Sequence, residues 1–188
     1  MELSSTQALP VSQAIAWEAL NDTSLLQAAI PGCEGITEIG ENEYEVIVVA
    51  AIGPVKAKFK GKLKLNDITP PTSYTLAFEG QGGAAGHGKG SAEVRLEATG
   101  DNETTLHYTA HATVGGKIAQ IGSRLIDMAA QKMAKEFFEK FTAVLVERQA
   151  PPPAEAEGDS AEAAEGGDDT AGADGQKKGW FKKLIGKG

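Results

Sequence analysis

The stretch GGKIAQIGSRLIDMAAQKMAKEFFEKFTAVLVER, residues 115–148, predicts one long amphipathic helix that closes the fold. Apolar side chains recur at steps of three and four, the spacing that places residues on one face of a helix. Toward residues 137–145 the stripe shifts around the helix, as expected where a helix follows a twisted sheet. Small residues on this face either bring the helix close to the sheet or leave an internal cavity. The first half of the stripe comprises Ile118, Ile121, Gly122, Leu125, Ala129 and Met133.

The sequence before this helix predicts an antiparallel sheet. Its clearest strand is VKAKFKGKLKL, residues 55–65, in which lysines alternate with apolar residues. Such alternation predicts a strand with one face in the core and one in solvent. About seven such segments are joined by loops of hairpin length, which excludes parallel neighbours. Two short helices are expected after the first strand, at residues 11–20 and 24–30. The predicted class is α+β, with the final helix on one face of a curved antiparallel sheet.

The lysines of that strand all point to the same side of the predicted sheet, and two interpretations stay open. A row of lysines is commonly a solvated face that discourages aggregation between sheets. The same row is also a basic stripe that an acidic partner or an anionic lipid surface would recognise. Its members are Lys56, Lys58, Lys60, Lys62 and Lys64.

Charge is unevenly distributed along the 188 residues. Residues 1–148 carry 13 basic and 18 acidic side chains, and this acidic excess argues against a nucleic-acid partner. The single cysteine, Cys33, excludes an intramolecular disulfide and fits a reducing compartment. The N-terminal residues lack the apolar region of a signal peptide, and no apolar run reaches the ~20 residues of a membrane span. We therefore expect a cytoplasmic protein.

No group of residues predicts catalytic or metal chemistry. The segment GAAGHGKGS, residues 83–91, approaches a phosphate-binding loop, but a strand pattern follows where a helix should begin. Its glycines instead predict a flexible hairpin or a thin cavity wall. His107 and His111 are about 13 Å apart along a strand, too far to share a metal. Cys33 is a candidate nucleophile, although a small buried thiol is its commoner role. Because Tyr108 is the only evident inward polar residue, any ligand is expected to be held by apolar contact.

The C-terminal residues predict a tether with a membrane-contacting tip. Residues 149–176 carry eight acids and no base, with Pro, Ala and Gly but no large apolar residue, so a disordered linker is expected. As a coil its r.m.s. reach is roughly 30 Å. Residues 177–188, KKGWFKKLIGKG, carry five lysines and form a basic amphipathic helix when folded against a surface. The alternatives are an unstructured basic end that pairs with the acidic linker, and a helix docked on a partner protein. The expected contact residues with anionic lipids of the inner leaflet are Lys178, Trp180, Phe181, Lys182, Lys183, Leu184, Ile185 and Lys187.

Four stretches within residues 1–148 resemble the CoxG family of carbon monoxide dehydrogenase proteins, part of the START-like (SRPBCC) helix-grip superfamily. They are WEALND at 17–22, IPGCEGI at 30–36, GKGSAEVRL at 88–96 and, most specifically, GGKIAQIGSRLIDMAAQKMAKEFFEKF at 115–141. The resemblance implies a seven-stranded antiparallel sheet that grips the C-terminal helix around an apolar cavity. It also implies an accessory, non-catalytic role for a molybdenum-containing carbon monoxide dehydrogenase at the membrane.

Together these features predict a protein peripheral to the cytoplasmic membrane that binds a lipophilic molecule, with no covalently bound cofactor. For a dehydrogenase of this kind the useful molecule is a respiratory quinone, which would accept its electrons. Two alternatives stay open: an adaptor without a ligand, which recruits the dehydrogenase to the membrane, and an enzyme acting on a hydrophobic substrate. The residues expected to line the cavity are Phe59, Leu63, Leu76, Phe78, Tyr108, Ile121, Leu125, Ala129 and Met133.

Overall fold

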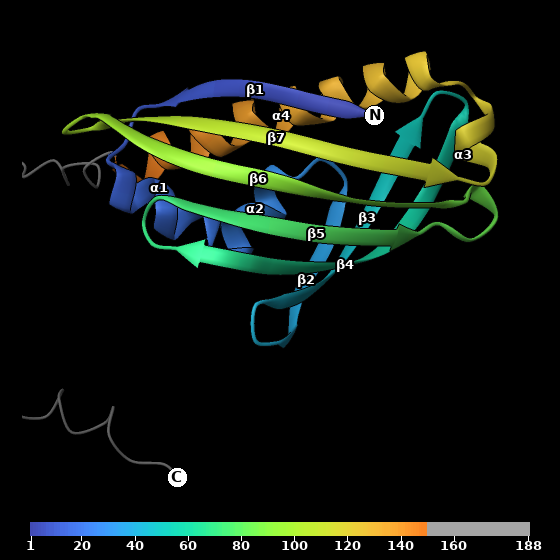
Figure 1. Ribbon diagram of the computed structural model, residues 1–188, viewed down its shortest axis with the longest axis horizontal. Coiled ribbons are helices and arrows are strands. Elements are labelled where there is room, and N and C mark those ends of the chain that lie inside the picture. Colours follow the sequence, from blue (N-terminus) through green and yellow to red (C-terminus); the bar gives the residue numbers. More distant parts are fainter. Residues whose placement is uncertain (150–188) are drawn as a thin grey trace, which may run out of the picture. The chain divides into compact units, whose positions relative to one another are not determined.

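Seven antiparallel strands form one curved sheet in the computed structural model, which describes residues 1–149 (Figure 1). The linker was predicted to begin at residue 149, which is the last residue of the C-terminal helix; the rest of it, residues 150–176, and the predicted tip lie outside the described residues. The strand order is β1-β7-β6-β5-β4-β3-β2, so the chain runs through successive hairpins from β2 to β7 and β1 pairs with β7. The strands are β1 (Glu2–Leu9), β2 (Cys33–Gly40), β3 (Glu43–Ile52), β4 (Val55–Thr69), β5 (Ser73–Gln81), β6 (His87–Gly100) and β7 (Glu103–Gly115).

Two short helices, α1 (Gln13–Leu20) and α2 (Thr23–Ala29), follow the first strand as predicted. The Ser12 side chain accepts a hydrogen bond from the backbone N–H of Ile15, which caps α1. Asp22 caps α2 by accepting from the backbone N–H groups of Ser24 and Leu25. Because each helix begins at a polar cap directly after a break in the preceding element, both were visible in the sequence.

The predicted C-terminal helix is broken near its start, which corrects the sequence analysis. A short helix, α3 (Lys117–Gln120), is separated from α4 (Ser123–Gln149) by Gly122, whose φ of +96° a right-handed helix does not allow. Gly122 is therefore a joint between two helices and not a small residue on a helix face. The break also changes which side chains of α4 point inward: Ile126 is 8% exposed, whereas Leu125 is 43% exposed.

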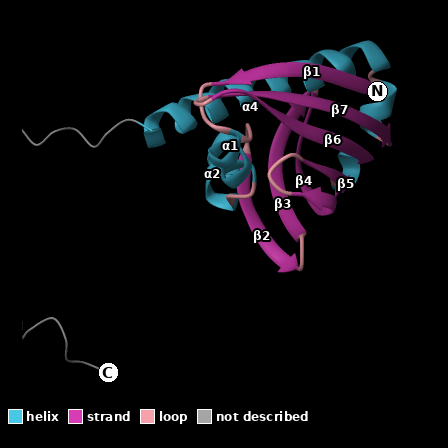
Figure 2. Ribbon diagram, turned by 60° about the vertical axis from the view of Figure 1, so that its left-hand side comes forward, coloured by secondary structure: helices cyan, strands magenta, loops and turns pink. Residues whose placement is uncertain are grey.

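The well-packed core lies at the end of the sheet that α1 and α2 cover (Figure 2). There the C-terminal half of α4 contributes Phe141 and Leu145, which are 0% and 1% exposed. The Arg148 guanidinium donates to the Asp22 carboxylate at 2.8 Å and ties the end of α4 to the start of α2. The Ser24 hydroxyl, Arg148 and the Leu25 N–H, in that order, hold the pKa of Asp22 well below its usual range.

The predicted fold class is confirmed: an α+β, helix-grip arrangement in which a seven-stranded antiparallel sheet curves around a long C-terminal helix. The nucleotide-binding interpretation of residues 83–91 is excluded, since β6 begins at His87 and no helix follows the glycines. Within residues 1–149 no helix is both long enough and apolar enough to cross a bilayer.

Candidate functional site

Two apolar cavities lie side by side between the sheet and the helices. The first, which we call the aromatic cavity, has a volume of about 290 Å³ and is bordered by α1, α2, the inner face of β2 to β7, and α4. Its walls hold three tyrosines and two phenylalanines among aliphatic side chains. The lining residues are Leu20, Asn21, Thr23, Leu26, Ile30, Ile36, Tyr44, Val46, Leu63, Leu65, Tyr74, Leu76, Ala92, Val94, Leu106, Tyr108, Phe137 and Phe138.

The second, the aliphatic cavity, has a volume of about 370 Å³ and opens to solvent. It shares Ile30, Val46 and Leu63 with the aromatic cavity, so the two adjoin along β3 and β4. Its other lining residues are Val48, Ala50, Ile52, Phe59, Gly61, Lys62, Phe78, Glu79, Gly80, Gly88, Val114, Ile118 and Met133.

A row of glycines forms the floor of the aliphatic cavity. Gly61 on β4 pairs with Gly80 on β5, and Gly80 pairs with Gly88 on β6, so three adjacent strands present no side chain at the same level. The row is flanked by Val46 on β3 and Val114 on β7. An ideal Cβ on Gly80 would find its nearest atoms at 4.0 Å, the outer limit of van der Waals contact, so a side chain would fit there without a clash. The cavity therefore exists because this inward row lacks side chains.

Two of the tyrosines that line the aromatic cavity, Tyr74 and Tyr108, are packed against other aromatic rings. Tyr74 is 6% exposed and packs edge-to-face on Trp17, with ring centroids 5.7 Å apart. Tyr108 stacks on Phe138 at 5.2 Å. Burial raises the pKa of Tyr74 far above its ordinary value and raises that of Tyr108, an effect that the Ser5 hydroxyl partly offsets. Both phenols are therefore neutral hydrogen-bond donors across the physiological range.

The structure places six of the nine predicted cavity residues in these two linings. Phe59, Leu63, Phe78 and Met133 border the aliphatic cavity, and Leu63, Leu76 and Tyr108 border the aromatic one. The remaining three, Ile121, Leu125 and Ala129, are in neither lining. The break at Gly122 interrupts the predicted stripe, and Ile121 and Leu125 lie against Gly53 at the tip of the β3–β4 hairpin instead.

Sequence reasoning missed the contribution of α2 and of the second half of α4. Leu26 and Ile30 come from α2 and the residue after it, whose short apolar pattern does not show that it faces a hollow. Phe137 and Phe138 fit plain packing in the sequence, yet both border the aromatic cavity. The sequence signals used for a hollow were the small residues of the helix face and the glycines of residues 83–91; the inward glycines Gly61 and Gly80 were not recognised as such a signal.

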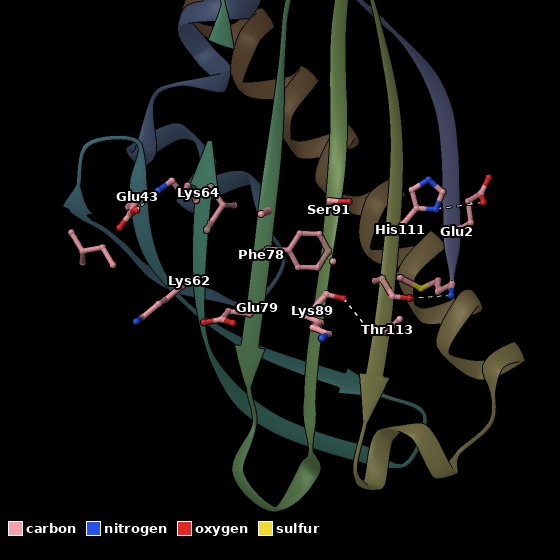
Figure 3. A pocket seen from close by; sticks show the side chains of 16 residues that line it. Glu2, Glu43, Lys62, Lys64, Phe78, Glu79, Lys89, Ser91, His111 and Thr113 are labelled. Atoms are coloured by element: carbon pink, nitrogen blue, oxygen red, sulfur yellow. Dashed lines mark hydrogen bonds and ion pairs between the residues drawn. The ribbon is translucent and has the colours of Figure 1, made fainter. Parts of the chain in front are cut away.

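A larger, open concavity of about 900 Å³ lies on the outer face of the sheet (Figure 3). Its side chains carry both signs of charge: Lys64 pairs with Glu43 at 2.7 Å, and His111 lies 3.5 Å from Glu2. Such a mixed, solvated surface suits a protein contact better than a lipophilic ligand.

The lysine row on β4 is largely neutralised by the chain itself. Lys58 pairs with Glu34 at 2.7 Å, and Lys60 pairs with Glu45 at 3.2 Å. With the Lys64 pair above, only Lys56 and Lys62 of the row lack an ion-pair partner among the described residues. This pairing favours the solvated-face interpretation over a basic docking stripe.

The remaining candidate groups give no site. Cys33 is half-buried at the start of β2, where burial raises the pKa of its thiol and disfavours the nucleophilic thiolate. His107 and His111 lie on the outer face, and within residues 1–149 no cluster of His, Cys, Asp or Glu could hold a metal ion.

Comparison with known proteins identifies the family. The family model of CoxG, which is named for carbon monoxide dehydrogenase, matches residues 7–146. The chain belongs to the CoxG family. The family's name links its members to carbon monoxide dehydrogenase in an accessory role. No curated protein matches the chain.

Solved structures confirm the START-like fold of this CoxG family member. A conserved protein from Geobacillus kaustophilus is 31% identical, with a TM-score of 0.74 over 78% of this chain and 96% of its own. A START superfamily protein from Mycobacterium smegmatis is 11% identical, with a TM-score of 0.62 over 78% of this chain and 98% of its own. The Zhui aromatase/cyclase from Streptomyces sp. R1128 is 14% identical, with a TM-score of 0.60 over 79% of this chain and 94% of its own. The last two likenesses concern the fold alone.

Proposed function

We propose that this protein binds a respiratory quinone between its sheet and α4 and works with a molybdenum-containing carbon monoxide dehydrogenase at the membrane surface. The observation that carries the proposal is the pair of adjoining apolar cavities, of about 290 and 370 Å³, walled almost wholly by hydrocarbon. Pockets of about 300–1,000 Å³ are of the size that holds small lipophilic molecules. The family is named for carbon monoxide dehydrogenase, an enzyme that needs an electron acceptor. We assign that acceptor, a quinone, to the two cavities.

One cavity has several aromatic side chains and phenol groups and the other has mostly aliphatic walls. A prenylated quinone likewise has a flat ring with carbonyl groups at one end and a hydrocarbon chain at the other. A quinone ring is flat and has two carbonyl acceptors, which suit aromatic walls and the phenol donors of Tyr74 and Tyr108. Its prenyl chain is purely hydrocarbon and suits the aliphatic cavity, whose lining has no tyrosine and only two aromatic side chains, Phe59 and Phe78, and which opens to solvent. We therefore place the ring in the aromatic cavity and the chain in the aliphatic cavity.

Membrane contact is proposed for the predicted tip, residues 177–188, on its sequence alone. Its lysines and its Trp180, Phe181, Leu184 and Ile185 form the basic and apolar faces of an interfacial helix. Each lysine beside an anionic surface adds up to about 1 kcal/mol. A tether of this kind would hold the domain within reach of membrane quinone and of a dehydrogenase docked nearby.

The test is chemical analysis of the full chain purified without detergent from a host that makes quinone. Organic extraction and mass spectrometry should recover quinone in near-stoichiometric amount, and added quinone should raise the melting temperature. Deleting residues 179–188 should abolish co-sedimentation with anionic vesicles while the cavity still binds quinone. Protein that emerges without quinone and does not respond to added quinone would refute the carrier function.

The other two functions are less well supported by the cavity. A ligand-free adaptor needs no hollow core. An unfilled cavity lowers the free energy of unfolding, and an adaptor would have no use for it. An enzyme on a hydrophobic substrate needs polar groups that converge on one point. Besides the tyrosines, the polar residues of the two linings are Asn21, Thr23, Lys62 and Glu79, of which the last two are exposed outward-facing residues.

A further inference from the structure

The chain turns a corner where α3 meets α4 (Figure 1). We call residues 116–132 the α3–α4 corner. Gly116 and Gly122, with φ of +80° and +96°, let the chain enter and leave α3 sharply. A Cβ built on Gly53, at the tip of the β3–β4 hairpin, would lie 3.4 Å from Ile121 and 3.8 Å from Leu125. The corner and the hairpin tip therefore meet, and Ile118 of the corner lines the cavity.

The corner exposes two large apolar side chains, one of which also touches the hairpin tip at Gly53. Leu125 is 43% exposed and Met128 is 58% exposed, although Ile126 between them is 8% exposed. Leu125 and Met128 are three residues apart on α4 and so share one outward face. Two large neighbouring side chains left in water beside an apolar opening indicate a surface that is covered when the protein works.

Charge around these side chains identifies what covers them. Arg124 and Lys132 flank the exposed pair on α4, Lys117 lies on α3, and Asp127 is the only acidic residue from 116 to 132. Neither Lys117 nor Arg124 forms an ion pair with another described residue. This local excess of base occurs in a segment 1–148 that carries more acid than base overall. Lys132 has a long, exposed ion pair with Glu136 at 3.8 Å. Apolar side chains rimmed by exposed cations, two of the three without a partner among the described residues, are typical of a surface that lies on anionic lipid.

We infer that the α3–α4 corner is a second membrane contact, built into the folded domain and separate from the predicted tip. Leu125 and Met128 enter the acyl region, Arg124, Lys117 and Lys132 contact anionic headgroups, and the aliphatic cavity opens toward the hydrocarbon. A lipophilic molecule would then pass between bilayer and cavity without crossing water. The inference rests on the proposed function for the identity of that molecule, but not for the contact itself.

The test places an environment-sensitive NBD fluorophore on single cysteines in the full-length Cys33→Ser chain. One label is at Met128→Cys, and the matched control is Ala143→Cys, an exposed position on the second half of the same helix. A third label, at Gly179→Cys, reports the predicted tip. Vesicles of phosphatidylcholine and phosphatidylglycerol with brominated acyl chains should quench the label at 128 at least twofold and leave the label at 143 unchanged. Vesicles of phosphatidylcholine alone should quench the label at 128 less.

Each pattern of quenching decides the matter. Quenching at 179 without quenching at 128 overturns the corner contact and supports the tip. Quenching at 128 without quenching at 179 supports the corner and refutes the tip, and no quenching at either refutes both. A label at 128 that is shielded without lipid, or only on addition of the dehydrogenase, also overturns the inference, since the covering surface is then protein. In the unlabelled chain, Leu125→Glu with Met128→Glu should slow quinone transfer between vesicles roughly tenfold.

Discussion

Replacing Gly80 by valine should fill the aliphatic cavity, stabilise the protein and abolish the function that we assign to it. Gly80 lies at the centre of the inward glycine row, between Gly61 and Gly88. Its φ is not in the left-handed region, and an ideal Cβ there finds its nearest atoms, the Gly61 Cα and the Lys60 oxygen, at 4.0 Å. A valine side chain can therefore stand on the floor of the cavity without displacing the backbone.

The expected gain in the free energy of unfolding is about 1–2 kcal/mol. Full burial of the three added carbon groups would contribute about 0.8 kcal/mol each. Because the cavity is open to solvent, the valine is only partly buried, and we count less than half of that contribution. Restricting the unfolded chain by replacing glycine adds about 0.4–1 kcal/mol. For a domain of this size the melting temperature should rise by roughly 2–8 °C. Bound quinone should fall at least tenfold, since the side chain occupies the volume of the ligand.

The assay pairs calorimetry with quinone extraction on the same detergent-free preparations. The matched control is Gly35→Val on β2, which adds the same atoms at a position where nothing lies within 4 Å and which borders neither cavity. The control should retain its quinone. A Gly80→Val protein that melts below the wild type, or that carries as much quinone as the Gly35→Val protein, would show that the glycine row does not form the ligand site.

Three further substitutions test the contacts and the backbone joint that position α4 beside the cavities. Gly122→Ala should lower the free energy of unfolding by about 1–2 kcal/mol, measured by urea unfolding, because an alanine is strained at a φ of +96°. A steric clash is not the cause, since a Cβ there would meet nothing within 4 Å. An unchanged urea midpoint would contradict a strained backbone at this joint. Asp22→Asn keeps the helix cap but loses the pairing with Arg148, and should lower stability by less than about 1 kcal/mol. Because the pKa of Asp22 is lowered on folding, that difference should be fully present at neutral pH, begin to shrink below the ordinary value of 3.8 and disappear only as the pH falls through the lowered pKa of the folded protein; a difference that does not shrink at all between pH 5 and pH 2 would count against it. Phe141→Ala should cost about 3–5 kcal/mol, and Phe138→Ala, at the wall of a cavity, clearly less by the same measurement.

The fold was predictable because its elements obey local rules. Alternation of lysine with apolar residues over 55–65 predicted β4 and its inner face, and the two short helices expected at residues 11–20 and 24–30 are α1 and α2, which Ser12 and Asp22 cap. Because loops of hairpin length cannot connect parallel neighbouring strands, they predicted an antiparallel sheet. The break at Gly122 was not predictable from periodicity, because a glycine at step four of an apolar stripe fits a helix as well as a joint.

The cavity was only partly predictable, since strand alternation shows which side chains point inward but not whether they meet. Phe59, Phe78 and Met133 were expected in the lining and are there. Whether Phe137 fills a core or walls a hollow depends on what stands opposite on the sheet, and that follows from register. The register of β4, β5 and β6 places three glycines side by side, although they are far apart in the sequence.

The distribution of packing along α4 leads to a last prediction about how the site opens. The core cluster takes Phe141 and Leu145 from the second half of the helix, with Phe137, Phe138 and Val144 packed against it, and takes nothing from residues 123–133. The second half is also tied to α2 through Arg148 and Asp22. From residues 123–133 only Met133 lines the aliphatic cavity and only Ile126 is buried, so this half loses less buried surface than the second half when it moves away from the sheet.

Amide hydrogen exchange should therefore be at least tenfold faster in residues 123–133 than in residues 137–145, a difference of about 1.4 kcal/mol in opening free energy. Added quinone should slow exchange in the first segment and leave the second unchanged, because only the first gains a packing partner. Equal protection along the whole helix would mean that α4 opens as one unit. Such a helix could admit a ligand only by giving up the core at its other end, so the two halves of α4 need different stabilities if the protein is to load and release its cargo while folded.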